Sequence, residues 1–147
     1  MDEIQMPPNR EGKIPDWGWL EGRTDIWRMQ ECAVAMAESP MNPKWKEAWV
    51  KELRTTEKAQ GLQCLRSDTD EFCCLGVLAD QMDPDGWDWE EPHPGDGLHL
   101  HNGTSRVLAV DLSVAAGLNG RQGPLTLLND THKLTFPQIA DMVEHYL

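Results

Sequence analysis

Residues 71–82 read EFCCLGVLADQM, and this stretch decides the fold. From Phe72 onward its side chains are apolar almost all round, which is typical of a helix at the centre of a domain. Thr69 or Asp70 can cap that helix at its start. Gly76 lies within it and costs about 1 kcal/mol relative to Ala. We therefore expect another part of the backbone to approach the helix closely at Gly76.

Two helices are predicted before this stretch. The first begins at Thr24 or Asp25, either of which can act as its N-cap, and ends at about Glu38. Asn42 begins the second, because Asn is a good N-cap and Pro43 fits the first helical position. The side chains expected on the inner faces of these two helices are Trp27, Val34, either Cys32 or Met36, Trp45, Trp49 and Leu53.

A loop and a hairpin are predicted after residue 82. Residues 83–97 contain three Pro and three Gly, which favours an irregular surface loop. Asn102-Gly103 is a preferred two-residue hairpin turn, because both residue types tolerate a positive φ. It predicts strands near 98–101 and 104–109.

The remaining segments complete the expected fold. A short helix is predicted at about 111–117 and a short strand at 125–128. Thr135 and Gln138 have the spacing of a capping box and begin the last helix. The expected inner face of that helix consists of Phe136, Ile139, Val143 and Tyr146.

We therefore predict an α+β domain that is mostly helical, with about four to five helices and one small antiparallel β-hairpin. It occupies residues 24–147 and follows an irregular N-terminal arm at residues 1–23, which contains three Pro and three Gly.

The composition limits the classes of function. The chain has 147 residues and a net charge of −12, and residues 67–96 contain ten acidic side chains and no Lys or Arg. Nucleic acids and anionic membranes are therefore poor partners, because both are bound through Lys and Arg. The sequence has no apolar run of membrane-spanning length and no apolar N-terminal signal, so we expect a cytoplasmic protein.

Neither a metal nor another cofactor is expected. No two cysteines have the C-x-x-C spacing of a zinc site, and a reducing cytosol predicts free thiols. His99 and His101 alternate on a predicted strand, so they face the same way, as zinc ligands or as a solvated hairpin face. Residues 83–91 lack the carboxylate spacing of a calcium-binding EF-hand loop.

One segment is predicted to bind a partner. In residues 83–91, tryptophans can supply buried contact area and carboxylates can steer a basic partner. The alternative is that the tryptophans hold an irregular segment against the core. The residues of this predicted surface are Asp83, Asp85, Trp87, Asp88, Trp89, Glu90 and Glu91.

Two other kinds of site remain open. The Cys73 thiol lies near a helix start and can act as a nucleophile if a histidine serves as its base. The acidic residues beside it raise its pKa, which opposes this role. The candidate bases are His93, His99, His101 and His132. A polar pocket for a phosphate or nucleotide can be formed by Trp49, Arg54, Arg66, Asn129 and Asp130.

The motifs in this chain resemble those of a family of small proteins encoded by tailed phages and prophages. The resemblance covers about residues 40–147. The matching parts are W-x-x-x-L-R at 49–54, F-C-C-L-G-V-L-x-D at 72–80, a G-L segment at 116–118, L-x-x-L-N-D at 125–130 and T-F-x-x-I-A-D-x-V-E at 135–144. The resemblance implies a phage origin and carries no activity with it.

The resemblance and the lack of a catalytic constellation together predict a non-enzymatic phage accessory protein. We expect it to act in the host cytoplasm by binding a host protein with a basic surface, and to inhibit a component of host defence. The acidic, Trp-bearing segment is the expected contact. The alternatives are sequestration of a small signalling nucleotide by the polar pocket and a Cys-dependent hydrolase.

Overall fold

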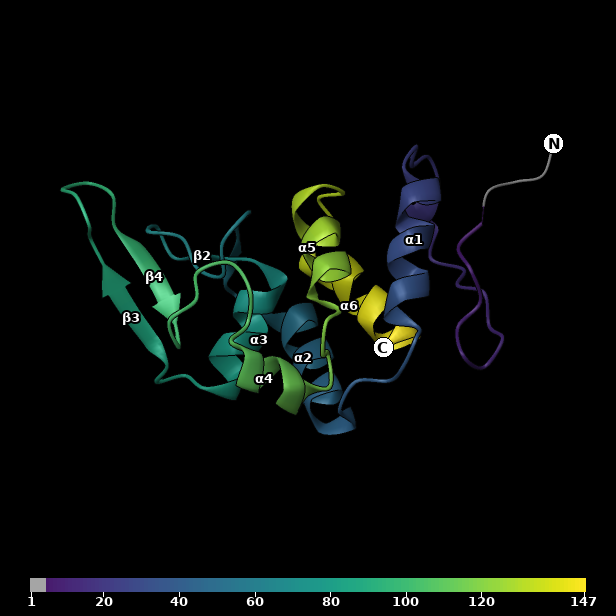
Figure 1. The fold of residues 1–147 in the computed structure, drawn as a ribbon. Helices are drawn as coiled ribbons and strands as arrows, with labels where there is room; N and C mark the ends of the chain where they lie inside the picture. Colours follow the sequence, from purple (N-terminus) through teal and green to yellow (C-terminus); the bar gives the residue numbers. More distant parts are fainter. Residues whose placement is uncertain (1–4) are drawn as a thin grey trace.

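The computed structural model describes residues 5–147 as an α+β fold, in which helices form the body and two small sheets lie beside them (Figure 1). The elements are η1 Gly18–Leu20, α1 Ile26–Met36, α2 Pro43–Thr55, β1 Ala59–Gln60, β2 Glu71–Phe72, α3 Cys74–Met82, β3 Trp87–Glu90, β4 Leu98–His101, α4 Val110–Ala116, α5 Gln122–Asp130 and α6 Phe136–Tyr146. Within residues 5–147, no helix is long and apolar enough to cross a membrane.

Helix α3 is the centre of the helical body, as its apolar sequence predicts. It packs against α2 and α5, while α2 packs most extensively against α6. The helix begins at Cys74, and Cys73 occupies the N-cap position that was predicted for Thr69 or Asp70. The later start follows from β2, because Phe72 pairs in parallel with Gln60 of β1 and is therefore extended.

The expected close approach at Gly76 is present. A Cβ atom built on this residue would lie 1.8 Å from the carbonyl oxygen of Leu65, far inside van der Waals contact. Leu65 is itself fully buried, and its amide donates a hydrogen bond to the Ser105 carbonyl. The segment that contains Leu65 thus lies directly on α3.

Two strand predictions were wrong. Residues 125–128 belong to α5, because Leu125 and Leu128 are buried one helical turn apart and a short apolar run fits a helix as well as a strand. The turn at Asn102-Gly103 forms, with positive φ at both residues. However, β4 pairs with β3, and of the expected strand 104–109 Thr104 alone pairs with β4, in an isolated antiparallel bridge to His101. Part of the expected loop at 83–97 is therefore a strand.

The inner face predicted for α1 was partly wrong. Trp27 and Val34 are 51% and 59% exposed, and the buried side is formed by Met29, Cys32, Ala33 and Met36. Helix α1 is apolar on both sides, so its sequence does not decide which side faces the core. The second apolar side of α1 remains on the surface.

The described part of the N-terminal arm is irregular apart from η1, and it is held against the body. Met6 is buried, and Arg10 donates hydrogen bonds to the carbonyls of Tyr146 and Leu147. The indole Nε1 of Trp19 donates to Asp141 on α6 at 2.8 Å. Residues 1–4 of the predicted arm lie outside the described residues.

A three-residue ionic cluster joins the start of α1 to the end of α5. Asp25 lies at the N-cap position of α1, but its side chain makes no capping bond. It accepts two hydrogen bonds from Arg23 and one, at 2.7 Å, from Nδ1 of His132. The bond to Arg23 is the main reason that the pKa of Asp25 falls from 3.8 to about 2.

We predict that Gly76→Ala lowers the free energy of unfolding by at least about 2 kcal/mol, because the methyl group displaces the Leu65 carbonyl from α3. Chemical denaturation measures the change. Gly123→Ala in α5 is the matched control, since its Cβ would meet nothing within 4 Å. The control should be neutral or stabilising by up to about 1 kcal/mol. Equal effects of the two substitutions would contradict the close approach.

We predict that Asp25→Asn destabilises the protein by about 1–2 kcal/mol at pH 7. Because the folded pKa of Asp25 is depressed, its contribution is present above about pH 4 and is lost as the pH falls towards 2. Melting curves of native protein and variant should therefore converge in this acidic range. Asp85→Asn should show no such difference, since Asp85 is exposed and makes no ion pair with a described residue.

Candidate functional site

Residues 83–101 form a hairpin, here called the acidic hairpin, that projects from one end of the helical body (Figure 1). Its strands pair antiparallel, with Trp87 opposite His101 and Trp89 opposite His99. Because these residues alternate along their strands, the two tryptophans and the two histidines share one face. The sequence predicted that His99 and His101 face the same way, but not that they lie beside Trp87 and Trp89. The other face carries Asp88 and Glu90 of β3.

Trp87 holds the hairpin against the body. Its Nε1 donates a 2.9 Å hydrogen bond to Asp80 on α3. Its ring meets the rings of Phe72 and His101 edge to face, with centroids 5.8 and 4.7 Å away. These contacts match the alternative role considered for the tryptophans, which is to attach an irregular segment to the core.

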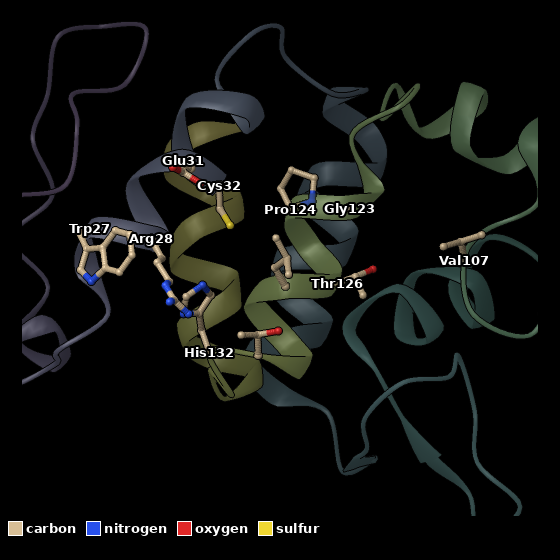
Figure 2. Close-up of a pocket in the computed structure, with 11 residues that line it drawn as sticks. Trp27, Arg28, Glu31, Cys32, Val107, Gly123, Pro124, Thr126 and His132 are labelled. Atoms are coloured by element: carbon tan, nitrogen blue, oxygen red, sulfur yellow. The ribbon is translucent and has the colours of Figure 1, made fainter.

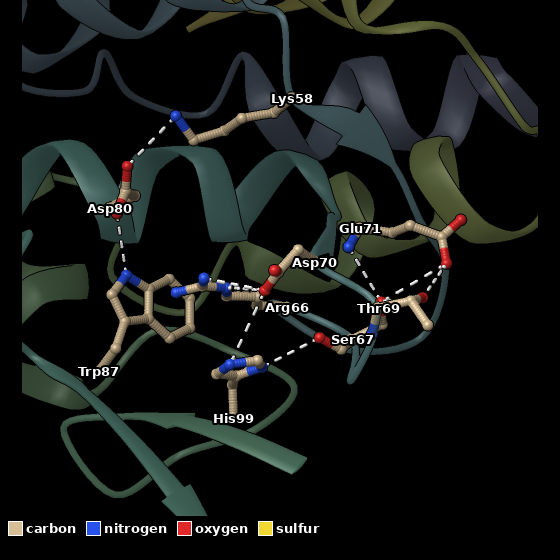
Figure 3. Close-up of polar contacts among 9 residues, drawn as sticks. All are labelled: Lys58, Arg66, Ser67, Thr69, Asp70, Glu71, Asp80, Trp87 and His99. Carbon is tan, nitrogen blue, oxygen red and sulfur yellow. Dashed lines mark hydrogen bonds and ion pairs between the residues drawn. The ribbon is translucent and has the colours of Figure 1, made fainter. Parts of the chain in front are cut away.

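Two cations lie at the base of the hairpin (Figure 3). Lys58 pairs with Asp80 at 3.3 Å, so the carboxylate that accepts from Trp87 is already neutralised. Arg66 stacks over the Trp87 ring at 5.4 Å and pairs with Asp70 at 2.8 Å. The base of the hairpin is thus a set of aromatic rings and paired charges.

Of the two histidines on the shared face, His99 contacts the body and His101 contacts the first residue of the hairpin. Nδ1 of His99 lies 3.0 Å from the Ser67 carbonyl, and Nε2 of His101 lies 2.8 Å from the Asp83 carbonyl. No group of three or more potential metal ligands occurs among residues 5–147. The geometry of the two side chains therefore fits a structural role in the hairpin.

Trp89 differs from Trp87 in its exposure. Its ring lies over Gly97, where a Cβ would come within 1.9 Å, and it meets His99 edge to face at 4.8 Å. Nevertheless, 49% of Trp89 is exposed. The hairpin thus positions a large apolar ring that folding leaves half accessible.

The carboxylates of the hairpin remain uncompensated. They belong to Asp83, Asp85, Asp88, Glu90, Glu91 and Asp96, and all but Asp83 are in exposed residues. None of them forms an ion pair with any residue that the structure describes. The region predicted to bind a partner therefore combines a fixed backbone, a half-exposed indole and a concentrated negative charge.

The residues of the predicted nucleotide pocket have other partners. Arg54 pairs with Asp141 and Glu144 on α6, whereas Arg66 pairs with Asp70 at the hairpin base. Trp49 is fully buried, and its Nε1 donates to the Cys74 carbonyl.

Asn129 and Asp130 are close to one another but serve the backbone of neighbouring segments. Asn129 is fully buried; it accepts from the amide of Cys74 and donates to the carbonyl of Gly61. Asp130 accepts from the amide of Gln63. These contacts are structural, and they do not direct the two side chains with Arg54 and Arg66 towards a common ligand.

The environment of Cys73 opposes nucleophilic catalysis. Its Sγ accepts a hydrogen bond from the Gly76 amide at 3.4 Å, and burial raises its pKa to about 12. Burial also raises the pKa of Cys74 well above its usual value. Both thiols are therefore protonated at neutral pH, whereas a nucleophilic cysteine requires the thiolate.

The structure also contains a groove that the sequence did not predict (Figure 2). It runs between α1 and α5, has a volume of about 760 Å³ and is mostly apolar. The residues that line it are Trp27, Arg28, Glu31, Cys32, Val107, Gly123, Pro124, Thr126, Leu127, Thr131 and His132. The groove was missed because Trp27 was predicted to be a core residue. The sequence did contain one indication of it, namely that α1 is apolar on two sides.

Comparison with known families was informative for the middle of the chain. Residues 41–109 match a family described as a domain of unknown function (DUF8296). The match spans α2, α3 and both strands of the acidic hairpin, and its description assigns no activity. No curated protein and no solved structure matches the chain significantly.

We predict that the two hairpin tryptophans have different effects on stability. Trp87→Ala should cost about 2–3 kcal/mol, because it removes a packed ring and the indole hydrogen bond to Asp80. Trp89→Ala should cost less than about 1 kcal/mol, since half of the ring is already in solvent. Urea denaturation followed by circular dichroism measures both changes. A Trp89→Ala variant that is as unstable as Trp87→Ala would show that the hairpin face is core.

Proposed function

We propose that this protein acts without catalysis, by binding another protein through the acidic hairpin. The observation that carries the proposal is the set of six carboxylates on the hairpin without ion-pair partners among the described residues, together with the half-exposed Trp89. The partner surface that fits is basic and has an apolar recess for an indole ring. Tryptophan is enriched among residues that dominate binding energy, and charge complementarity accelerates association.

The attachment of the hairpin supports this function. Trp87 of β3 and His99 of β4 fix the hairpin to the body through their contacts with Asp80 and Ser67. A surface that is already ordered loses little conformational entropy on binding. The hairpin can therefore present Trp89 and the neighbouring carboxylates in one arrangement.

We further propose that the protein is an accessory protein of a tailed phage and that its target is a host protein of a defence system in the cytoplasm. This part of the proposal rests on the motifs shared with small phage and prophage proteins. Inhibition follows if the hairpin occupies a basic surface that the target needs for an anionic ligand such as a nucleic acid.

The test is binding to host proteins captured on immobilised protein and then measured individually. In one variant, Asp85, Asp88, Glu90, Glu91 and Asp96 are replaced by Asn or Gln. In the matched control, the same change is made at exposed acids elsewhere, namely Asp16, Glu21, Glu38, Glu57 and Asp111. The two variants have equal net charge.

We predict that the hairpin variant associates at least roughly tenfold more slowly at low salt, whereas the control changes little. Trp89→Ala should instead accelerate dissociation, because it removes buried contact area. Surface plasmon resonance separates the two rates. If both charge variants bind alike, the acidic hairpin is not the contact, and the proposal fails.

A further inference from the structure

Helix α1 exposes an apolar side that the fold does not cover. Trp27 and Val34 are 51% and 59% exposed, and they lie seven residues apart, on one side of the helix. Leu127 of α5 is 47% exposed on the opposite wall of the groove. Trp27 and Leu127 line the groove, and Val34 continues the exposed apolar side of α1 outside it. A contiguous exposed apolar patch of this kind marks an interaction site.

The groove is nearly neutral in a strongly acidic molecule. The groove is lined by one arginine, Arg28, and one glutamate, Glu31, and their opposite charges cancel. The whole chain carries −12. Two copies repel each other over most of their surfaces, and they can approach most easily through a neutral apolar face.

The two charged residues of the groove are also available. Neither Arg28 nor Glu31 forms an ion pair with any residue from 5 to 147; the Arg28 guanidinium stacks over Trp27 at 4.7 Å. Figure 2 shows both side chains on α1, at the wall of the groove that faces α5. The surface thus carries one positive and one negative side chain, three residues apart on α1.

We propose that the groove face is the interface of a homodimer in which α1 lies antiparallel to α1 of a second copy. A two-fold interface is self-complementary: if one residue of the first copy contacts another residue of the second copy, the same contact also forms with the two copies exchanged. If Arg28 lies opposite Glu31 of the second copy, Trp27 lies opposite Val34. The midpoint between residues 28 and 31 and the midpoint between residues 27 and 34 differ by about one residue, so one antiparallel alignment of the two helices forms both pairs. Both ion pairs and both apolar pairs then form at once.

This arrangement favours a second copy over an unrelated partner. Reciprocal pairing uses the cation and the anion of the same surface, with no requirement for an additional charged group. The acidic hairpin lies at the opposite end of the molecule from α1 (Figure 1), so its six carboxylates stay away from the interface. The dimer is independent of the function proposed for the hairpin.

The first experiment measures mass by sedimentation velocity over a range of concentrations. We expect native protein to form dimers and Leu127→Asp to be monomeric, because the substitution introduces a charge into the apolar groove. Leu62→Asp is the matched control, since Leu62 is 44% exposed and lies outside the groove. Circular dichroism checks that both variants are folded.

The second experiment exchanges the charges. Arg28→Glu and Glu31→Arg should each weaken dimerisation at least roughly tenfold, because each places like charges opposite one another. The double variant, with both substitutions, should recover it. Glu31→Arg is decisive, since it reduces the net charge of the chain and would strengthen association if only overall repulsion mattered.

Several results would overturn the proposal. They are a native protein that is monomeric at all concentrations, a dimer that Leu127→Asp leaves intact, and single charge variants that the double variant does not rescue. A monomer that binds laurate, with loss of that binding in Leu127→Asp, would assign the groove to an amphipathic small molecule instead.

Discussion

The contact between the Leu65 carbonyl and α3 at Gly76 is the constraint on which the rest of the structure depends. With any side chain at position 76, the Leu65 segment would have to move away from the helix. That segment leads directly into Arg66, which stacks on Trp87, and into Ser67, whose carbonyl meets His99. A single missing Cβ in the core thus determines where the acidic hairpin attaches, which connects core packing to the candidate binding surface.

Local signals in the sequence predicted the parts of the fold that depend on neighbouring residues. The capping box of Thr135 and Gln138, the N-cap at Asn42 and the turn at Asn102-Gly103 all form, because each is completed within a few residues. The pairing of β4 with β3 was missed, since it depends on a partner strand within a Pro- and Gly-rich segment. The orientation of Trp27 was wrong because both sides of α1 are apolar, so only the rest of the fold selects the buried side.

The candidate site divides in the same way. The sequence alone was enough to locate the concentrated negative charge, because residues 67–96 contain ten acidic side chains and no Lys or Arg. It could not separate the roles of Trp87 and Trp89, because the Asp80, Phe72 and Arg66 side chains that hold Trp87 arrive from other elements. Similarly, Arg54 was predicted to line a ligand pocket, because the sequence does not show that Asp141 and Glu144 of α6 lie beside it and form ion pairs with it.

Ion pairs surround the base of the acidic hairpin, whereas the carboxylates of the hairpin itself form none with the described residues. Lys58 and Arg66 come from the segment between α2 and α3, and they neutralise Asp80 and Asp70 at the point where the hairpin meets the body. The Asp80 side chain is 28% exposed, and its pairing with Lys58 offsets part of the cost of removing its charge from water, whereas the Asp70 side chain is 62% exposed and stays solvated. The carboxylates farther along the hairpin are in exposed residues and can remain unpaired without that penalty, because water solvates them. The cations near the hairpin therefore lie at its base, and the outer carboxylates keep their negative charge in water.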